Sequence, residues 1–229
     1  MNELLFFLTT IVSFTLVLVA YRLFGKVGMW AWMCIATIIA NIEVAKCVDI
    51  FGLAATLGNV IYGSTFLSTD ILSENHGDRV AKRSVWMGFF FMLVTTALLQ
   101  LSLLFVPNGS DFASPAMKTI FSLVPRFVLA SILCFLLSNR LDIFLFKKIG
   151  EHTRRVWVKN NLATMTAQLV DSVLFTFMAF WGVFEFPVLL QLIGTTYVMK
   201  FLIAIMDTPF LYIAKRMKRE GKVGSLINL

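Results

Sequence analysis

The chain has 229 residues, of which 59% are hydrophobic and only 14% are charged, and its formal net charge is +7. A mean hydropathy of +0.83 excludes a soluble globular domain, because a surface that faces water needs far more charged side chains. Apolar segments recur along nearly the whole length and leave no room for a separate soluble domain. The composition therefore predicts one all-α, polytopic membrane domain over residues 1–229.

Seven apolar segments are long enough to cross roughly 30 Å of hydrocarbon as helices. They are expected at residues 4–21, 28–50, 54–74, 85–106, 119–141, 161–185 and 188–213. Turn signals separate them, such as Phe51-Gly52 and the run 107–110. The third segment is polar enough to be a broken or re-entrant helix. The first lacks the basic region of a signal peptide, so we expect it to be retained.

Basic side chains fall in alternate loops, which predicts the orientation of the chain. They follow the first, third, fifth and seventh segments, at 22–26, 79–83, 147–159 and 215–222, and Lys118 is the exception. Cytoplasmic loops of membrane proteins hold such residues, so we expect the N-terminus outside and the C-terminus in the cytoplasm. The positive charge then serves topology and requires no nucleic acid as partner.

The segments also suggest an internal arrangement. Residues 1–26 would form an extra N-terminal helix, 27–110 a first helix triplet, and 111–229 a second triplet with a basic cytoplasmic tail. Two triplets that share a fold must be inverted relative to each other, as in many secondary transporters. The alternative is that any two triplets of membrane helices look alike.

Acidic side chains inside apolar segments indicate an internal polar site. Asp70 and Glu74 lie one helical turn apart, and Asp171 recurs in the middle helix of the second triplet. A charge at the bilayer centre costs roughly 2.5 to 3.5 kcal/mol, so such groups normally face a protein-lined cavity. For Glu74 the alternative is an interfacial acid that pairs with Arg79 or Arg83.

Other polar residues join these acids as candidates for the cavity wall. Lys200 lies deep enough in its segment to require an acidic partner, Asp171 or Asp70. Arginine within an apolar run likewise needs a carboxylate or carbonyl partner. The further candidates are Asn41, Arg126, Ser131 and Gln168.

Two sets of residues receive other interpretations. Glu43, Lys46 and Asp49 follow at spacings of three, which predicts one helical face with mutual neutralisation, and a structural and a functional role both stay open. The three cysteines lie in apolar runs without paired spacing, so we interpret them as core residues and expect neither a disulfide nor a metal site.

Several of these segments resemble the queuosine precursor transporter family. They are GSTFLSTDILSENHG at 63–77, the 126–142 segment with Ala130-Ser131, the 168–172 segment that continues to Trp181, and Lys200. The resemblance covers about residues 41–200, and the first helix looks like an addition to the six-helix core of that family. It implies import of 7-deazaguanine compounds, which are precursors or salvage products of the tRNA nucleoside queuosine, across the inner membrane.

That implied substrate suggests roles for the polar residues. A guanine-like edge presents an N1–H beside an exocyclic amine, which one carboxylate, Asp70 or Asp171, can accept as a pair. Gln168, Asn41 or Arg126 could reach the O6 carbonyl. Phe66 and Phe175 are candidates for stacking on the base. Asn139 and Gln168 are amides that differ from those of other members, which leaves the particular deazaguanine open.

The sequence contains no motif for catalysis, and we expect no enzyme activity, cofactor or catalytic metal. The nearest alternative function is the substrate-capture subunit of a vitamin-type ABC importer, which also has about six helices. Ala36 and Ala40 are compatible with the small-residue stripe on which such subunits dock. The expected partners are a small-molecule 7-deazaguanine and the lipid bilayer. Energy coupling and oligomeric state stay open, with a homodimer among the alternatives.

Overall fold

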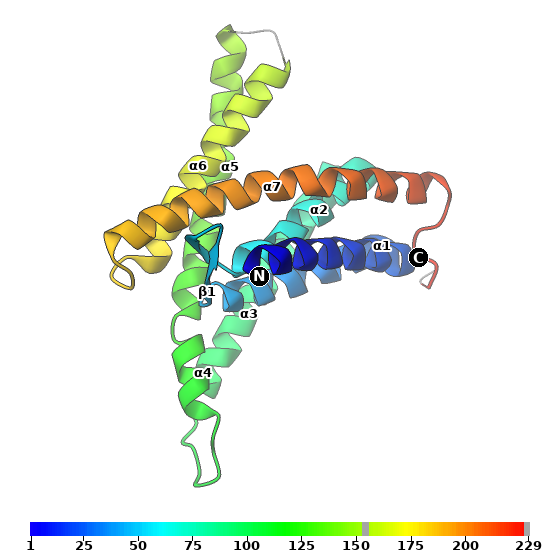
Figure 1. The fold of residues 1–229 in the computed structure, drawn as a ribbon. Coiled ribbons are helices and arrows are strands. Elements are labelled where there is room, and N and C mark those ends of the chain that lie inside the picture. Colours follow the sequence, from blue (N-terminus) through cyan, green and yellow to red (C-terminus); the bar gives the residue numbers. More distant parts are fainter. Residues whose placement is uncertain (153–155, 227–229) are drawn as a thin grey trace.

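The computed structural model describes residues 1–152 and 156–226, apart from the side chains of residues 147, 150, 152 and 156–161. The described chain is predominantly helical, which confirms the predicted all-α class of membrane bundle (Figure 1). Its elements are α1 (Asn2–Glu43), β1 (Cys47–Ile50), β2 (Leu53–Thr56), α2 (Gly58–His76), α3 (Asp78–Ser102), α4 (Ser114–Phe121), α5 (Val124–His152), α6 (Val156–Phe180) and α7 (Phe186–Arg219). Within the described residues, five helical stretches are long and apolar enough to span a membrane: Asn2–Glu43, Asp78–Ser102, Ser114–Phe146, Leu162–Phe180 and Phe186–Arg219.

Helix α1 consists of two helical segments that fold back on each other at Gly25. This residue has φ 56° and ψ −136°, a conformation that glycine adopts far more readily than other residues. A Cβ atom on Gly28 would clash with the carbonyl oxygen of Ala20, although eight residues of straight helix would separate the two residues by about 12 Å. At the far end, Asn2 donates from Nδ2 to the carbonyl oxygen of Asp49 at 2.8 Å. α1 is thus a helical hairpin, and the count of seven spans stays a prediction.

A β-hairpin replaces the last residues of the second predicted helix. The expectation of a helix over 28–50 was wrong at its C-terminal end, because α1 stops at Glu43 and Cys47–Ile50 pairs antiparallel with Leu53–Thr56. Phe51 and Gly52 form the two-residue turn with φ 54° and 75°, and turns with positive φ at both positions match the twist of paired strands. Glu43, Lys46 and Asp49 therefore do not share one helical face.

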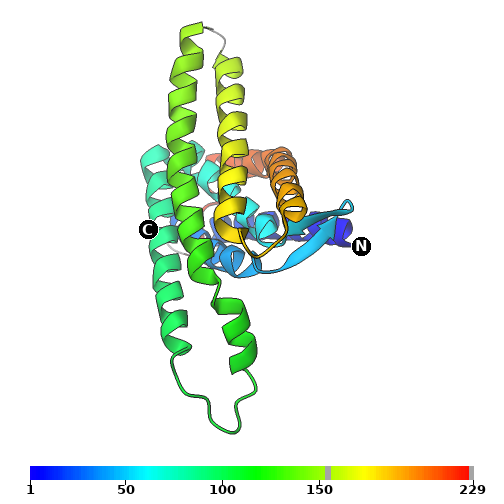
Figure 2. The same cartoon turned by 90° about the vertical axis from the view of Figure 1, so that its left-hand side faces the viewer.

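Two groups of helices cross each other steeply. Figure 1 shows α5 and α6 side by side, while α1 and α7 run across them; Figure 2 shows α3 running lengthwise with α5 and α6. α2 and α7 run parallel and pack against each other. Asn59 bonds to Thr196, and further along both helices a Cβ on Gly63 would lie 2.7 Å from Ile203. α6 and α7 diverge from the short loop that joins them, so their far ends lie apart.

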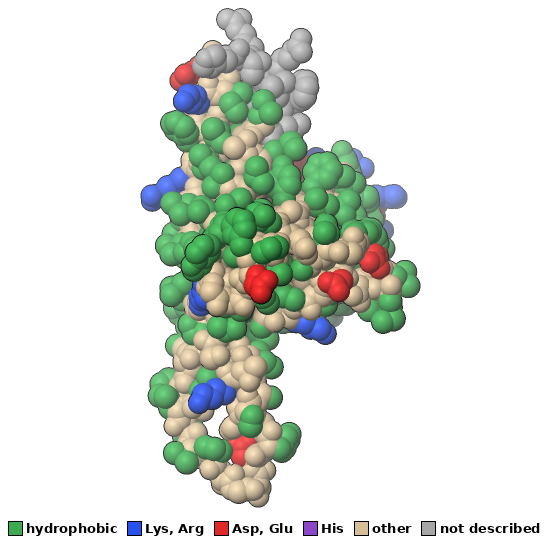
Figure 3. Space-filling view, turned by 60° about the vertical axis from the view of Figure 1, so that its left-hand side comes forward, with side chains coloured by type: hydrophobic (Ala, Val, Ile, Leu, Met, Phe, Trp, Pro, Cys, Tyr) green, Lys and Arg blue, Asp and Glu red, His purple; other side chains and the backbone are tan. Residues whose placement is uncertain are grey.

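The outer surface is apolar along the helices and basic at several ends. Figure 3 shows hydrophobic side chains spread over the helices and few charged ones on that face. The C-terminal tail returns to the turn of α1, because the amides of Ser225 and Leu226 donate to the carbonyl oxygens of Arg22 and Leu23 at 3.1 and 2.9 Å. The basic end of α7 therefore lies beside the basic turn of α1. Most side chains of the predicted basic loop 147–159 lie outside the described residues.

Candidate functional site

A cavity with an empty volume of about 470 Å³ lies where α1, α2, α5, α6 and α7 meet. Its lining residues are Ala40, Asn41, Val44, Gly58, Asn59, Tyr62, Ser131, Cys134, Asp171, Phe175, Thr196 and Lys200. We call it the central cavity. It brings together five of the residues that the sequence singled out, Asn41, Ser131, Asp171, Phe175 and Lys200.

An ion pair joins α6 and α7 in the wall of the central cavity. The Nζ atom of Lys200 lies 2.5 Å from Oδ2 of Asp171, and the two side chains are 11% and 21% exposed. The expectation that Lys200 requires an acidic partner is confirmed, and the partner is Asp171. A buried charge that loses its partner is costly, so each of these two groups compensates the charge of the other.

Asn41 and Ser131 form a second polar contact, between α1 and α5. The Ser131 hydroxyl donates to Oδ1 of Asn41 at 3.0 Å, and Nδ2 of Asn41 donates to the carbonyl oxygen of Thr37 at 2.9 Å and lies 2.9 Å from Sδ of Met92. The amide of Asn41 is thus used within the protein. Its part is to hold the Ser131 hydroxyl, whose lone pairs stay available as acceptors.

Four further residues with polar side chains line the cavity and are not among the predicted site residues: Asn59, Tyr62, Cys134 and Thr196. Nδ2 of Asn59 donates to the hydroxyls of Thr56 and Thr196 at 2.9 and 3.0 Å, which links α2 to α7. The spacing could have indicated Thr196, which precedes Lys200 by one helical turn on the same face. Asn59 and Tyr62 belong to the polar third segment, from which Phe66, Asp70 and Glu74 are the predicted site residues.

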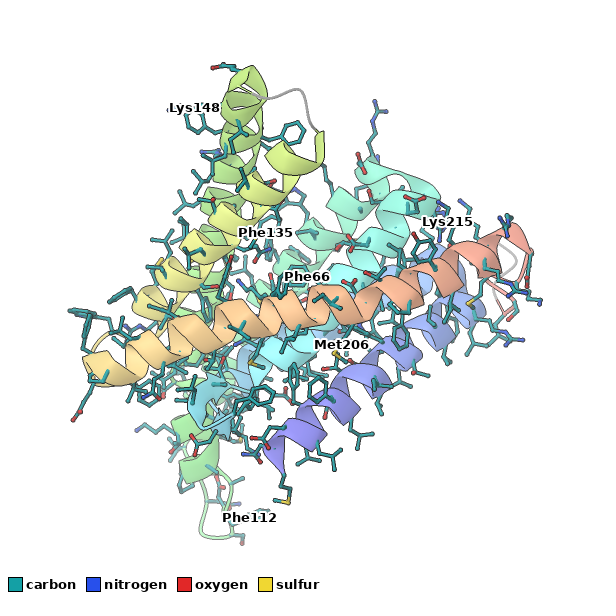
Figure 4. All side chains as sticks on the ribbon, turned by 45° about the horizontal axis from the view of Figure 1, so that its top comes forward. Phe66, Phe112, Phe135, Lys148, Met206 and Lys215 are labelled. Atoms are coloured by element: carbon teal, nitrogen blue, oxygen red, sulfur yellow. The ribbon has the colours of Figure 1, made fainter. Side chains whose placement is uncertain are left out.

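Two further cavities share lining residues with the central cavity, and other predicted site residues line them. Phe66 and Gln168 line the first of these together with Asp171 and Tyr62. Asp70 lines the second, which lies between α6 and α7 and includes Lys200. Figure 4 shows Phe66 and Phe135 in the space between the α5–α6 pair and α7. We call these two the flanking cavities; Asp70 belongs to them and not to the central cavity.

Glu74 and Arg126 lie away from all of these cavities. Glu74 is exposed and pairs with Lys215 on α7, and not with Arg79 or Arg83, the partners in the alternative interpretation. Arg126 donates from Nε to the carbonyl oxygen of Met178 at 2.8 Å and from Nη2 to that of Trp181 at 2.6 Å. The expected carbonyl partner of Arg126 is confirmed. These bonds satisfy carbonyl groups at the C-terminal end of α6 that have no partner within the helix.

The β-hairpin connects two helices that line the central cavity. The end of α1 and the start of α2 both line it, and the hairpin joins them. Thr195 on α7 donates from Oγ1 to the carbonyl oxygen of Ala54 at 2.7 Å, and the amide of Ala54 donates to Oε1 of Gln191 at 3.3 Å. Side chains of α7 therefore anchor strand β2 beside the cavity.

Comparisons with known proteins agree on a transporter. A family model described as "Putative vitamin uptake transporter" matches residues 56–214. A Bacillus subtilis protein named "Probable queuosine precursor transporter" is 40% identical over 210 residues, which are 90% of this chain and 92% of that protein. An Escherichia coli protein named "Queuosine precursor transporter" is 27% identical over 142 residues, 62% of each chain. No solved structure matches significantly. The chain therefore belongs to the queuosine precursor transporter family of membrane proteins.

Proposed function

We propose that this protein carries queuosine precursors of the 7-deazaguanine class across the membrane, with the central cavity as their binding site. The names of the two relatives supply the substrate class. The observation that supports the site is the Lys200–Asp171 ion pair, which lies in the polar wall of the central cavity.

The chemistry of the ion pair matches a guanine-like edge. That edge presents an acceptor, O6, followed by two donors, N1–H and the 2-amino group. Lys200 presents donors directly beside the two acceptor oxygens of Asp171, so the order of donors and acceptors is complementary. Phe175 lines the same cavity and offers an aromatic face for the planar base. Phe66, Asp70 and Gln168 line the flanking cavities, through which the substrate would reach the site.

The arrangement of the cavities supports an inward-facing state. We place the protein in the inner membrane with its N-terminus outside and its C-terminus in the cytoplasm. In this orientation the β-hairpin lies on the outer side, and the diverging ends of α6 and α7 lie on the cytoplasmic side. The cavity that includes Asp70 occupies the space between α6 and α7. Alternating access then requires the α5–α6 pair to move toward α7 on the inner side and away from the hairpin on the outer side.

The capture subunit of an ABC importer is the alternative that the names of the relatives do not favour. Such a subunit binds its ligand but cannot accumulate it without the energised partner subunits. A transporter of this family moves its ligand unaided, and we propose no enzyme activity for it.

Uptake by proteoliposomes that contain only this protein tests the function. We expect saturable uptake of labelled 7-cyano-7-deazaguanine by the wild type and about 100-fold weaker binding by Asp171→Asn, because an amide loses the charge-assisted pair of hydrogen bonds. Ser102→Ala, on the exposed end of α3, is the control and should transport normally. Binding without uptake would contradict the transporter and favour a capture subunit, whereas normal binding by Asp171→Asn would contradict the site.

A further inference from the structure

Ser138 touches the ion pair from outside the central cavity. It lies on α5, two turns beyond Ser131, and lines the flanking cavity that it shares with Asp171. Its Oγ atom is 3.1 Å from Oδ1 of Asp171. The carboxylate of Asp171 is therefore held at one oxygen by Ser138 from α5 and at the other by Lys200 from α7.

The hydroxyl of Ser138 has more acceptors than protons. Its oxygen is also 2.7 Å from the carbonyl oxygen of Cys134 and 3.4 Å from that of Phe135, which are the usual acceptors for a serine inside a helix. A hydroxyl has one proton to donate. If that proton stayed on Cys134, a lone pair of Ser138 would face the Asp171 carboxylate at 3.1 Å and repel it.

The charge of Asp171 decides where this proton lies. Lys200 forms an ion pair with this carboxylate, and a hydrogen bond to an ionised acceptor is roughly twice as strong as one to a neutral carbonyl. The proton of Ser138 is therefore directed at Asp171 while the ion pair exists. Because the terminal torsion of an aspartate rotates easily, this bond also sets the plane of the carboxylate.

We propose that Ser138 is a positioning residue that orients Asp171 for two adjacent N–H donors of the ligand. The inference rests on the proposed function, because it assumes that the ligand binds the Asp171 edge. Ser138 fixes one oxygen from the α5 side and Lys200 fixes the other, so the remaining lone pairs of both oxygens face the cavity together. A ligand with two neighbouring donors benefits from that fixed plane, whereas a ligand with one donor can follow a rotated carboxylate.

The test compares two ligands that differ in one donor. Binding of 7-cyano-7-deazaguanine and of 7-cyano-7-deazahypoxanthine, which lacks the 2-amino group, is measured on the full chain. The wild type should prefer the first by about tenfold or more, because the second leaves one carboxylate acceptor unpaired. Ser138→Ala should weaken the binding of the first ligand by about tenfold and that of the second by less than about twofold, so that most of the preference for the first ligand is lost.

Conservative variants separate positioning from simple packing. Ser138→Thr keeps the hydroxyl and should restore the preference, and Ser138→Cys, a weak donor of similar size, should fall between the two. Ser102→Ala removes another helical serine whose hydroxyl bonds only to its own helix, at 2.7 Å from the carbonyl oxygen of Leu99, and should leave both affinities unchanged. A Ser138→Ala protein that weakens both ligands equally, or neither, overturns the role of Ser138.

Asp171→Asn distinguishes the two levels of the argument. If that variant loses binding while Ser138→Ala keeps the wild-type preference, the inference about Ser138 is wrong and the proposed site survives. If Asp171→Asn binds both ligands as the wild type does, the proposed site and the role of Ser138 are both wrong.

Discussion

At the scale of single residues, polar contacts line the central cavity, and each of them joins two helices. Asn41 meets Ser131 between α1 and α5, and Asp171 meets Lys200 between α6 and α7. Such contacts satisfy polar groups that lipid cannot solvate. The same groups that hold the helices together therefore line the space in which a polar ligand would bind.

The ion pair should matter for stability as well as for binding. Lys200→Met leaves a carboxylate without its cation, so we expect a loss of about 3 to 5 kcal/mol in the free energy of unfolding. Adding Asp171→Asn removes the unpaired charge and should recover most of that loss while binding stays absent. Thermal unfolding of the purified variants, measured beside ligand binding, checks both parts; a double variant as unstable as Lys200→Met would contradict the pairing.

Arg126 is expected to contribute to structure and not to affinity. Its guanidinium bonds to the carbonyl oxygens of Met178 and Trp181. Arg126→Met leaves those carbonyls without donors and should cost about 1 to 3 kcal/mol of stability. The dissociation constant for 7-cyano-7-deazaguanine should stay within about twofold of wild type. A variant with wild-type stability and lost binding would return Arg126 to the site, as its place in the sequence first suggested.

At the scale of elements, backbone geometry decides where helices end. Gly25 turns α1 back on itself, and Phe51-Gly52 turns the strands. The sequence contained both signals, because Phe51-Gly52 was assigned as a separator and a break was placed between residues 21 and 28. The strands were missed because Val48 and Ile50 continue the apolar run of the helix, and apolarity alone does not distinguish a short strand from the end of a helix.

A glycine comparison tests the α1 turn. Gly25→Ala forces a side chain into the left-handed region and places a Cβ 3.4 Å from Val223, so it should destabilise the protein by about 1 to 3 kcal/mol. Gly194→Ala is the matched control, because nothing lies within 4 Å of its Cβ on α7, and alanine favours a helix over glycine by about 1 kcal/mol. Equal effects of the two changes on the unfolding temperature would contradict the strained turn.

At the scale of the whole molecule, α6 and α7 diverge from the short loop that joins them, and residues of both helices line a flanking cavity. Figure 4 places Lys148 and Lys215 at the far ends of α5 and α7, and Phe112 in the loop after α3 at the opposite end. This separation agrees with basic inner ends and an apolar outer loop. The orientation, the seven spans and the inverted triplets stay predictions.

Cysteine labelling in intact cells tests the orientation and the inward-facing state together. Cys47 is exposed on the β-hairpin, so a membrane-impermeant maleimide should label it from outside. Ala204 lines the flanking cavity between α6 and α7, so Ala204→Cys, in a chain whose own cysteines are replaced, should react only in inside-out vesicles. Labelling of Cys47 from inside alone would reverse the topology. Equal labelling of Ala204→Cys from both sides would contradict the inward-facing state.

The sequence by itself determined the class of the protein, since hydropathy and loop charges follow from composition and require no knowledge of packing. It also indicated Asp171 and Lys200, because ionisable groups in lipid must find partners. Only the tertiary structure decided which partners they find: Lys200 with Asp171, Glu74 with Lys215, and Arg126 with backbone carbonyls. These choices depend on how helices distant in sequence cross, and the pattern along a single helix contains no information about that.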